Sequence, residues 1–228
     1  MSCNPAVGGV AKGVVAREVD ALGGVMGRAT DASRIQFRML NKSKGPAVWS
    51  PRAQCDRRLY RQAVQRLLRE ISGLSLLEDM VTGLVLEQGT AVGIRTGGEL
   101  ELRAGAVVVT AGTFLRGKIH IGGEESVAAG RAGEGPSVEL AQDLEARGLE
   151  IARFKTGTPP RIDGRTVNFA GTERQDGDAG EFRFAAYDKE AIPEQRPCWI
   201  TWTGEALKSV VERNLERSAL FGGEISGR

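Results

Sequence analysis

The sequence predicts an α/β protein of the nucleotide-binding type. Segments with helical periodicity alternate along the 228 residues with segments that have strand patterns. Glycine accounts for 31 residues and aromatic residues for only 5%, a balance typical of many tight turns and close backbone approaches. A continuous apolar run, AVVVTAGTF at 106–114, indicates a parallel strand that is buried on both faces.

The composition excludes several classes of protein. The net charge is +2, from 31 basic and 29 acidic residues, so no global basic field drives binding to nucleic acid. The longest apolar runs are far too short to span a bilayer, and no signal-peptide pattern precedes them. Three cysteines without a CxxC pair, and a single histidine, argue against a zinc site and favour a reducing cytoplasm.

The first elements follow a glycine-dense loop, MSCNPAVGGVAKG, that runs directly into a helix. That helix is predicted up to the Gly23-Gly24 pair, with five apolar side chains near one face: Val10, Val14, Val15, Val19 and Leu22. A short strand is expected at 35–40, a long polar loop at 41–54, and an amphipathic helix at 52–71. In this second helix apolar residues recur every four positions among arginines.

The middle of the chain predicts an antiparallel meander at 80–88, 91–96 and 99–103, because two-residue connectors suit tight hairpins. The buried strand 106–114 follows, then a glycine-rich loop, a helix at 137–148 and a strand at 149–157. The rest alternates short strand-like pieces, EFRFAAY and PCWITWT, with acidic loops and ends in a helix.

This order of elements is typical of flavoproteins with two dinucleotide-binding domains, after their first strand–helix unit. That unit would carry the GxGxxG fingerprint, which does not occur here: neither GGVAKG nor GEGPS follows a strand. We therefore expect that the chain begins after the position of the first strand–helix unit of such a domain. The domain prediction is a partial FAD-binding domain at 1–150 and an incomplete, inserted β-rich domain at 151–228.

Three cysteines and one histidine are candidate reactive residues. Cys3 precedes a predicted helix amino terminus, whose unpaired N–H groups favour thiolate, so it is the best nucleophile, with a small buried side chain as the alternative. Arginines near Cys55 could also favour thiolate, but a position inside a helix favours packing. Cys198 is expected in the core, and a structural role is expected for His120.

Basic residues gather around the 41–54 loop together with Trp49, a combination that suits a phosphate backbone and a splayed base. They are Lys42, Lys44, Arg52, Arg57 and Arg58. A solvated helix face is the alternative, and the sequence alone favours it. The segment KTGTPPRID at 155–163 could hold an anion or form a rigid turn.

Seven segments in order carry a family resemblance: MSCNPAVGGVAKG, EVDALGG, IQFRMLNKSKGPAV, RAQCDRRLYRQAV, TAGTFLRGKIHIGG, GRAGEGPS and KTGTPPRID. Together they closely resemble the MnmG (GidA) family over essentially the whole chain. The resemblance implies an FAD-dependent enzyme that adds an aminomethyl or carboxymethylaminomethyl group at C5 of tRNA wobble uridine 34. It also implies the partner GTPase MnmE, NADH as reductant, methylenetetrahydrofolate as one-carbon donor and a homodimer in the full-length family.

The resemblance also implies roles for individual residues. Cys3 matches one of two family cysteines proposed for catalysis, whose thiolate would attack C6 of the uracil. Val81 matches a backbone contact to the FAD adenine, and Ser137 matches another FAD contact. Gly112 and Thr113 end the predicted buried strand where the cofactor passes. No residue is predicted to bind a metal.

Two departures limit these implications. WSP at 49–51 replaces a stretch that usually carries a further arginine, and both the GxGxxG unit and the second cysteine are missing. The alternatives are the folate- and FAD-dependent tRNA uracil-54 methyltransferases and a non-catalytic fragment that binds RNA or a partner. We expect this polypeptide alone to bind FAD weakly or not at all.

Overall fold

The computed structural model describes residues 4–121, 125–180, 182–188, 190–223 and 225. The chain forms two compact units. The first contains the residues up to 75 together with 158–202, and the second contains 76–157 together with the residues from 203 onward. The predicted domain boundary at residue 150 stays a prediction.

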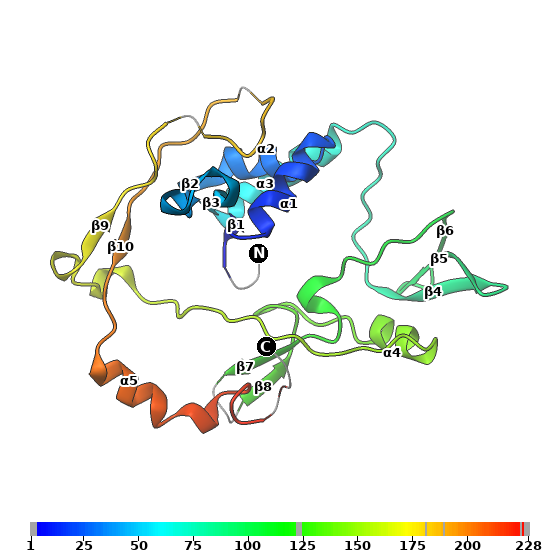
Figure 1. Cartoon of the computed structure of the whole chain (residues 1–228). Helices are drawn as coiled ribbons and strands as arrows, with labels where there is room; N and C mark the ends of the chain where they lie inside the picture. Colours follow the sequence, from blue (N-terminus) through cyan, green and yellow to red (C-terminus); the bar gives the residue numbers. More distant parts are fainter. Residues whose placement is uncertain (1–3, 122–124, 181, 189, 224, 226–228) are drawn as a thin grey trace. The chain divides into compact units, whose positions relative to one another are not determined.

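The first unit is built on a three-stranded antiparallel sheet with the order β1-β3-β2. Its strands are β1 (Ala6–Gly8), β3 (Ser50–Cys55) and β2 (Arg34–Leu40), so that β3 pairs on both edges. Helices α1 (Lys12–Ala21), α2 (Met26–Ser33) and α3 (Arg57–Arg69) lie around this sheet (Figure 1). The predicted strand at 35–40 and the helix after the glycine loop are confirmed.

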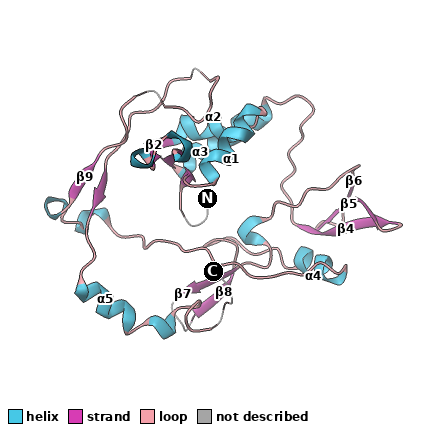
Figure 2. Ribbon diagram, viewed as in Figure 1, coloured by secondary structure: helices cyan, strands magenta, loops and turns pink. Residues whose placement is uncertain are grey.

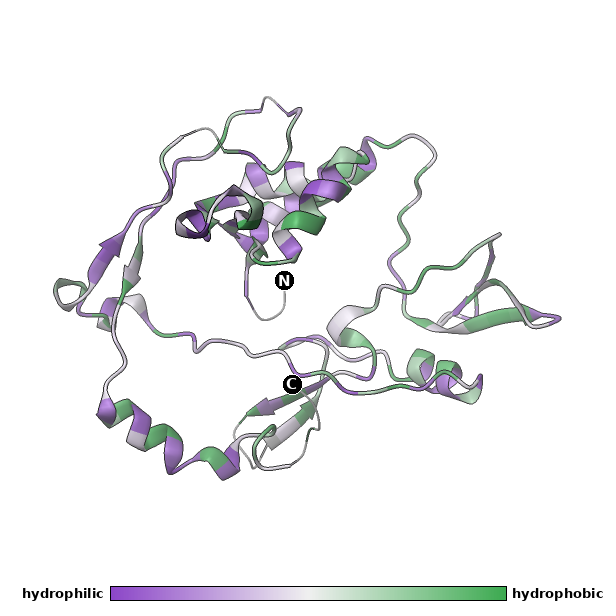
Figure 3. Cartoon of the chain, viewed as in Figure 1, coloured by the Kyte–Doolittle hydropathy of each residue, from purple (hydrophilic) through white to green (hydrophobic). Residues whose placement is uncertain are grey.

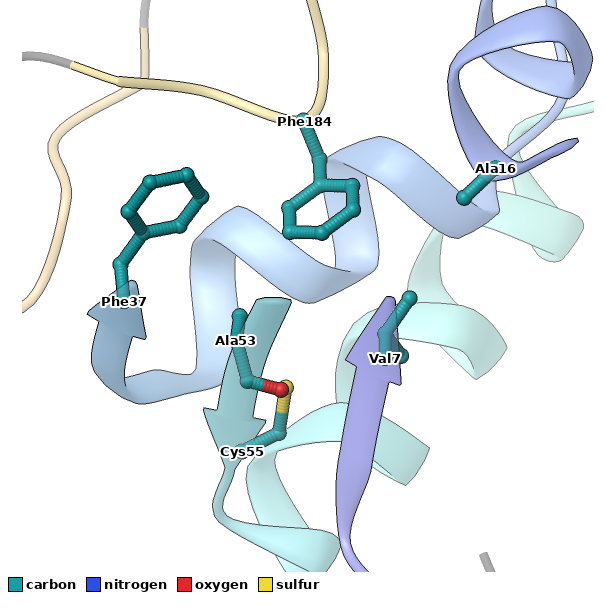
Figure 4. Packing of buried hydrophobic residues seen from close by; sticks show 6 residues of the cluster. All are labelled: Val7, Ala16, Phe37, Ala53, Cys55 and Phe184. Carbon is teal, nitrogen blue, oxygen red and sulfur yellow. The ribbon is translucent and has the colours of Figure 1, made fainter. Parts of the chain in front are cut away.

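The core of this unit joins the sheet to a segment far along the chain. Val7, Ala16, Phe37, Ala53, Cys55 and Phe184 are all buried and form one cluster (Figure 4). A smaller cluster of Ala29, Ala63 and Leu67 lies between α2 and α3. Apolar burial of this kind is the main favourable term in folding.

The prediction that the valines of α1 form its buried face is wrong. Gly13 and Ala16 are the buried residues of this helix, whereas Val14 and Val15 are about half exposed. A Cβ on Gly13 would come within 2.6 Å of the Pro51 carbonyl oxygen, so α1 approaches β3 through its smallest residues.

The predicted helix at 52–71 begins later than expected, because its first residues are needed elsewhere. Residues up to Cys55 form the central strand β3, and Asp56 then caps α3. The Asp56 carboxylate accepts hydrogen bonds from the backbone N–H groups of Arg58 and Leu59, at 2.8 and 2.9 Å. Of the predicted apolar positions in this helix, Ala63 and Leu67 are buried.

Residues 182–187 do not form the strand predicted for EFRFAAY. Backbone N–H groups of this segment donate to side-chain carboxylates and not to a neighbouring strand. Asp31 accepts from the N–H groups of Phe184 and Ala185, at 3.1 and 2.9 Å, and Asp20 accepts from that of Ala186 at 2.9 Å. Burial raises the pKa of Asp31, although these hydrogen bonds and nearby Arg34 oppose that rise. The segment is therefore fixed to α1 and α2 by side chains.

A further segment, 173–198, lies along β2. Within it, β9 (Glu173–Gln175) pairs antiparallel with β10 (Cys198–Ile200), which confirms a strand in PCWITWT. Asp178 donates its backbone N–H to the Phe37 carbonyl at 2.8 Å, and its carboxylate accepts from the Met39 N–H at 2.7 Å. Short 3-10 turns occur at Lys42–Lys44, Pro46–Val48, Gly164–Thr166 and Phe169–Gly171.

The second unit contains the predicted meander. Strands β4 (Val81–Glu87), β5 (Thr90–Thr96) and β6 (Glu101–Arg103) form an antiparallel sheet in sequence order. Helix α4 (Glu139–Ala146) packs on β4, which confirms the predicted helix at 137–148. A second hairpin pairs β7 (Lys118–Ile121) with β8 (Glu125–Ala128), where a glycine-rich loop was expected.

Two predicted strands of this unit are not formed. Residues 106–111 have no strand partner, and Val108 is 83% exposed. Residues 149–157 are also irregular (Figure 2), with Phe154 88% exposed. The described strands of this unit pair only with one another, so neither apolar run has a neighbour to complete its backbone hydrogen bonds.

The last helix, α5 (Glu205–Glu212), is followed by a 3-10 turn at Leu215–Arg217. Its apolar residues Leu207, Val210 and Val211 are exposed and alternate with polar residues along the helix (Figure 3). Among the described residues, no helix is long and apolar enough to cross a membrane.

Candidate cofactor-binding site

The four predicted cofactor contacts lie in the second unit. Val81 is the first residue of β4 and pairs with Thr96, the last residue of β5. Gly112 and Thr113 lie in a 3-10 turn, Gly112–Phe114, which follows the irregular apolar run. Ser137 lies two residues before the first residue of α4.

Ser137 joins the other segments. Its backbone N–H donates to the Phe114 carbonyl at 2.8 Å, and its own carbonyl accepts from the Arg116 N–H at 2.8 Å. Its hydroxyl donates to the Val81 carbonyl at 3.4 Å. Three segments that are distant in sequence therefore meet at Ser137. Its side chain contacts the meander and does not cap α4, where no side-chain cap occurs.

The turn at Gly112–Phe114 has the backbone geometry that its glycine predicts. Gly112 has φ +58°, a left-handed conformation that glycine adopts at little cost, and a Cβ there would meet only open space. By contrast, a Cβ on Gly117 would come within 2.3 Å of the Thr113 carbonyl oxygen. The turn is therefore closely packed on the side of Gly117 and open at Gly112.

Helix α4 is held on β4 by a charged pair. The Asp143 carboxylate accepts from the Leu84 N–H at 2.9 Å, and Arg147 donates both to this carboxylate and to the Leu84 carbonyl, at 2.8 Å each. The hydrogen bond from Arg147 lowers the pKa of Asp143. These contacts fix the helix that follows Ser137 relative to the strand that begins at Val81.

Thr96 is a residue of this region that the sequence did not single out. It is only 4% exposed, and its hydroxyl has no hydrogen-bond partner among the described residues. An orphaned buried hydroxyl is costly unless something completes it. A threonine at the end of a predicted strand is an ordinary sequence feature, so only the structure distinguishes it.

The predicted catalytic residue Cys3 lies outside the described residues. Cys55 is at the end of β3, not inside a helix, and is 1% exposed. Burial raises the pKa of its thiol to about 11, which supports the packing role. Cys198 is half-buried in β10, and its thiol lies 3.0 Å from Gln36 Oε1.

The remaining candidate residues belong to other elements. His120 is in β7. The predicted 41–54 loop ends earlier than expected, because Ser50 begins β3. Between β2 and β3, the Trp49 indole donates to the Lys42 carbonyl at 3.2 Å, and Lys42 forms an ion pair with Asp178 at 2.8 Å. No group of three or more histidine, cysteine and acidic residues that could hold a metal ion occurs among the residues that the structure describes.

Comparison of folds defines the class of the molecule as a mixed α/β chain of the GidA type. The structure matches that of Aquifex aeolicus GidA in its form I crystal, with a TM-score of 0.89 and 42% identity, over 100% of this chain and 39% of that chain. A second crystal form of the same protein matches with a TM-score of 0.87, over 96% of this chain and 37% of that chain. The predicted α/β fold class is thereby confirmed.

The particular family follows from the sequence. A family model described as "Glucose inhibited division protein A" matches residues 1–228, and the chain belongs to this family. It is 49% identical over 227 residues to proteins from Thermodesulfovibrio yellowstonii and Exiguobacterium sibiricum. Both are named tRNA uridine 5-carboxymethylaminomethyl modification enzyme MnmG. The match covers 100% of this chain but 36% of each relative, so the chain spans about a third of their length. The predicted MnmG (GidA) resemblance is confirmed.

Proposed function

We propose that the chain is part of an FAD-dependent enzyme that adds an aminomethyl or carboxymethylaminomethyl group at C5 of tRNA wobble uridine 34. Relatives at 49% identity are named for this modification. The observation that carries the proposal is the convergence on Ser137, whose hydroxyl and amide reach the Val81 and Phe114 carbonyls. The start of β4, the turn at Gly112–Phe114 and the residues before α4, which the resemblance implies contact FAD, therefore lie next to one another.

The residues of these segments fit the adenosine half of FAD. Val81 pairs in register with Thr96, and Gly112 opens onto unfilled space beside the turn that leads toward Ser137. Val81 and Ser137 would hold the cofactor through backbone and hydroxyl groups, and the turn at Gly112 and Thr113 would let it approach closely. When bound, FAD supplies the redox chemistry, with NADH as reductant.

Cys3 would activate the uracil. Its thiolate adds to C6, and the C5–C6 π electrons move toward C5 and O4 as an enolate. C5 then forms a bond to the one-carbon unit carried by methylenetetrahydrofolate, and one of the two bonds between that carbon and folate nitrogens breaks. An incoming amine, ammonia for the aminomethyl product or a primary amine that carries the carboxymethyl group for the other product, forms a bond to the same carbon as its bond to the second folate nitrogen breaks and folate leaves. Loss of the C5 proton and departure of the thiolate from C6 restore the uracil double bond. The catalytic role of Cys3 is an implication of the family.

Partners and location are proposed on the same basis. We assign the GTPase MnmE as the partner in the reaction and a homodimer as the state of the longer protein. A cytoplasmic location is consistent with a tRNA substrate and with cysteines that form no CxxC pair.

Mass analysis of tRNA from a strain that lacks the gene tests this proposal. We expect the C5 modification to disappear at position 34 while position 54 stays unchanged. Loss of 5-methyluridine at position 54 with an intact position 34 would identify the uracil-54 methyltransferase activity and overturn the proposal. No change at either position would favour a non-catalytic role.

A further inference from the structure

Helix α3 carries one strongly basic face. Its sequence, RRLYRQAVQRLLR, contains five arginines and no acidic residue. All five are exposed, and the four that have no carboxylate partner among the described residues are here called the arginine stripe: Arg57, Arg58, Arg61 and Arg69. The stripe lies within the first unit, on a helix whose other side packs against α2.

Helical geometry places the stripe opposite the core. At about 100° per residue, its four positions fall within an arc of roughly 120°, centred opposite the buried residues Ala63 and Leu67. From Arg57 to Arg69 the stripe is about 18 Å long at a rise of about 1.5 Å per residue. Arg57 and Arg61 are one turn apart, so their guanidinium groups extend from the same side.

The charge of the stripe is not neutralised within the described part of the chain. None of its four arginines has a carboxylate partner there, whereas Arg66, which lies off the stripe, pairs with Glu70 and Glu190. Many other arginines are also paired. They include Arg103 with Glu87, Arg116 with Glu145, Arg147 with Asp143, Arg165 with Asp163 and Arg174 with Asp176. In a chain of net charge +2, the unpaired stripe is therefore a local concentration of positive charge.

We infer that the arginine stripe binds the phosphate backbone of the RNA substrate. This inference rests on the proposed function, which supplies tRNA as the ligand. Guanidinium groups match phosphate in a bidentate manner, and a row of them along an extended surface suits a repeating polyanion. The Asp56 carboxylate already caps the helix amino terminus, so side chains and not the helix dipole provide the contacts.

The geometry favours RNA over a membrane surface. A membrane-bound amphipathic helix inserts an apolar face, but the apolar residues Ala63 and Leu67 of α3 are buried in the core of the protein. The contacts are expected to be independent of base sequence, because arginine binding to phosphate carries no sequence information. The stripe would therefore orient the tRNA without selecting the base that is modified.

A matched pair of double variants tests the inference on the purified 228-residue chain. Arg57→Gln with Arg61→Gln removes two unpaired charges from the stripe. The control, Arg165→Gln with Arg174→Gln, removes two exposed charges from the same unit, both paired with a carboxylate. Both double variants lower the net charge by two, so a general charge effect would alter them equally.

The measurement is the affinity for an unmodified tRNA transcript as a function of salt, with circular dichroism to establish that the variants stay folded. We expect the stripe variant to bind about tenfold or more weakly near 0.1 M salt, with a salt slope reduced by about two. The affinity of the control variant for tRNA should stay within about twofold of the wild-type affinity. A variant with all four stripe arginines replaced by Gln should have a salt slope that is smaller by about three to four.

If both double variants bind tRNA equally more weakly than wild type, or if neither changes in affinity, the inference that the stripe binds RNA is wrong, while the proposed function is unaffected. A wild-type chain that binds no tRNA even at low salt would contradict the stripe. The position-34 analysis above would still test the proposed function independently. Polyglutamate serves as a competitor that mimics an acidic protein. If it displaces tRNA at the same concentration of charge, and if the stripe variant binds polyglutamate as weakly as it binds tRNA, the ligand of the stripe would be an acidic protein partner instead.

Discussion

Cys55 and Phe184 show how the environment of a residue decides its role. Arginines surround Cys55 in the sequence, which suggests an activated thiol, but burial removes water from it and raises its pKa to about 11. Phe184 has no special sequence context, yet it is fully buried and its ring lies edge-on to that of Phe37, with ring centres 5.9 Å apart. Burial depends on contacts between residues distant in sequence, and it determines both the low reactivity of the Cys55 thiol and the packing role of Phe184.

The Cys55 thiol should react slowly with an alkylating reagent. At pH 8 a pKa near 11 leaves roughly a hundredfold less thiolate than a pKa near 9, and the raised pKa means that reactivity increases only as the pH approaches 11. Mass mapping of the alkylated chain should show Cys55 unmodified in the folded state and modified in denaturant. Equal rates in the two states would contradict its burial.

Replacing Phe184 by Ala should lower the free energy of unfolding by about 3–5 kcal/mol, because it leaves a cavity in the core of the first unit. Tyr187→Ala is the control, since this neighbouring aromatic residue is 88% exposed and its loss should cost less than about 0.5 kcal/mol. Urea unfolding measures both variants. A Phe184 variant as stable as the Tyr187 variant would refute the described core.

At the scale of elements, the first unit depends on segments that return from far along the chain. The Asp178 carboxylate links the 173–198 segment to the Met39 N–H of β2 and to the Lys42 ammonium just beyond that strand. Burial alone would raise the pKa of Asp178, but hydrogen bonds from Lys42 and Met39 outweigh it and hold this pKa below its usual value.

Asp178→Asn should therefore destabilise the chain by about 1–2 kcal/mol at pH 7. Because the folded pKa is lowered, the contribution of the carboxylate is complete above the unfolded pKa of about 3.8 and is lost as the pH falls through the folded pKa. Unfolding curves at pH 7 and below pH 4 should show the two proteins converging in acid. A constant difference at all pH values would show that the charge of Asp178 plays no part.

The local elements of the fold could be predicted from the sequence, whereas the pairing of distant segments could not. The meander and α4 follow from periodicity and turn residues, and Asp56 has the residue type of a helix cap at the position where α3 begins. Residues 106–111 and 182–187 have the composition of strands, but a strand also needs a neighbour, which only the tertiary structure supplies. For the same reason the family resemblance implied only separate FAD contacts, and neither the meeting of three segments at Ser137 nor the orphaned Thr96 hydroxyl was predicted.

At the scale of the whole molecule, the chain belongs to the GidA family but spans about a third of the length of its MnmG relatives. Its second unit contains the residues that the family resemblance implies contact FAD, while the sequence has no GxGxxG unit to neutralise the pyrophosphate. These two features together predict what the chain can do alone.

The purified 228-residue chain should hold far less than one equivalent of FAD. The residues around Val81 and Ser137 would supply only part of the contacts to FAD, and the negative pyrophosphate has no helix amino terminus of the fingerprint type to meet it. Flavin absorbance after dialysis against FAD measures the occupancy. Retention near one equivalent would contradict this prediction.

The central claim is that this chain takes part in covalent activation of wobble uridine 34, and a single chromosomal change tests it most directly. Cells that carry Cys3→Ser in the gene for this chain should contain tRNA with unmodified uridine at position 34, as measured by mass spectrometry, at unchanged protein level. A fully modified position 34 in these cells would contradict the account.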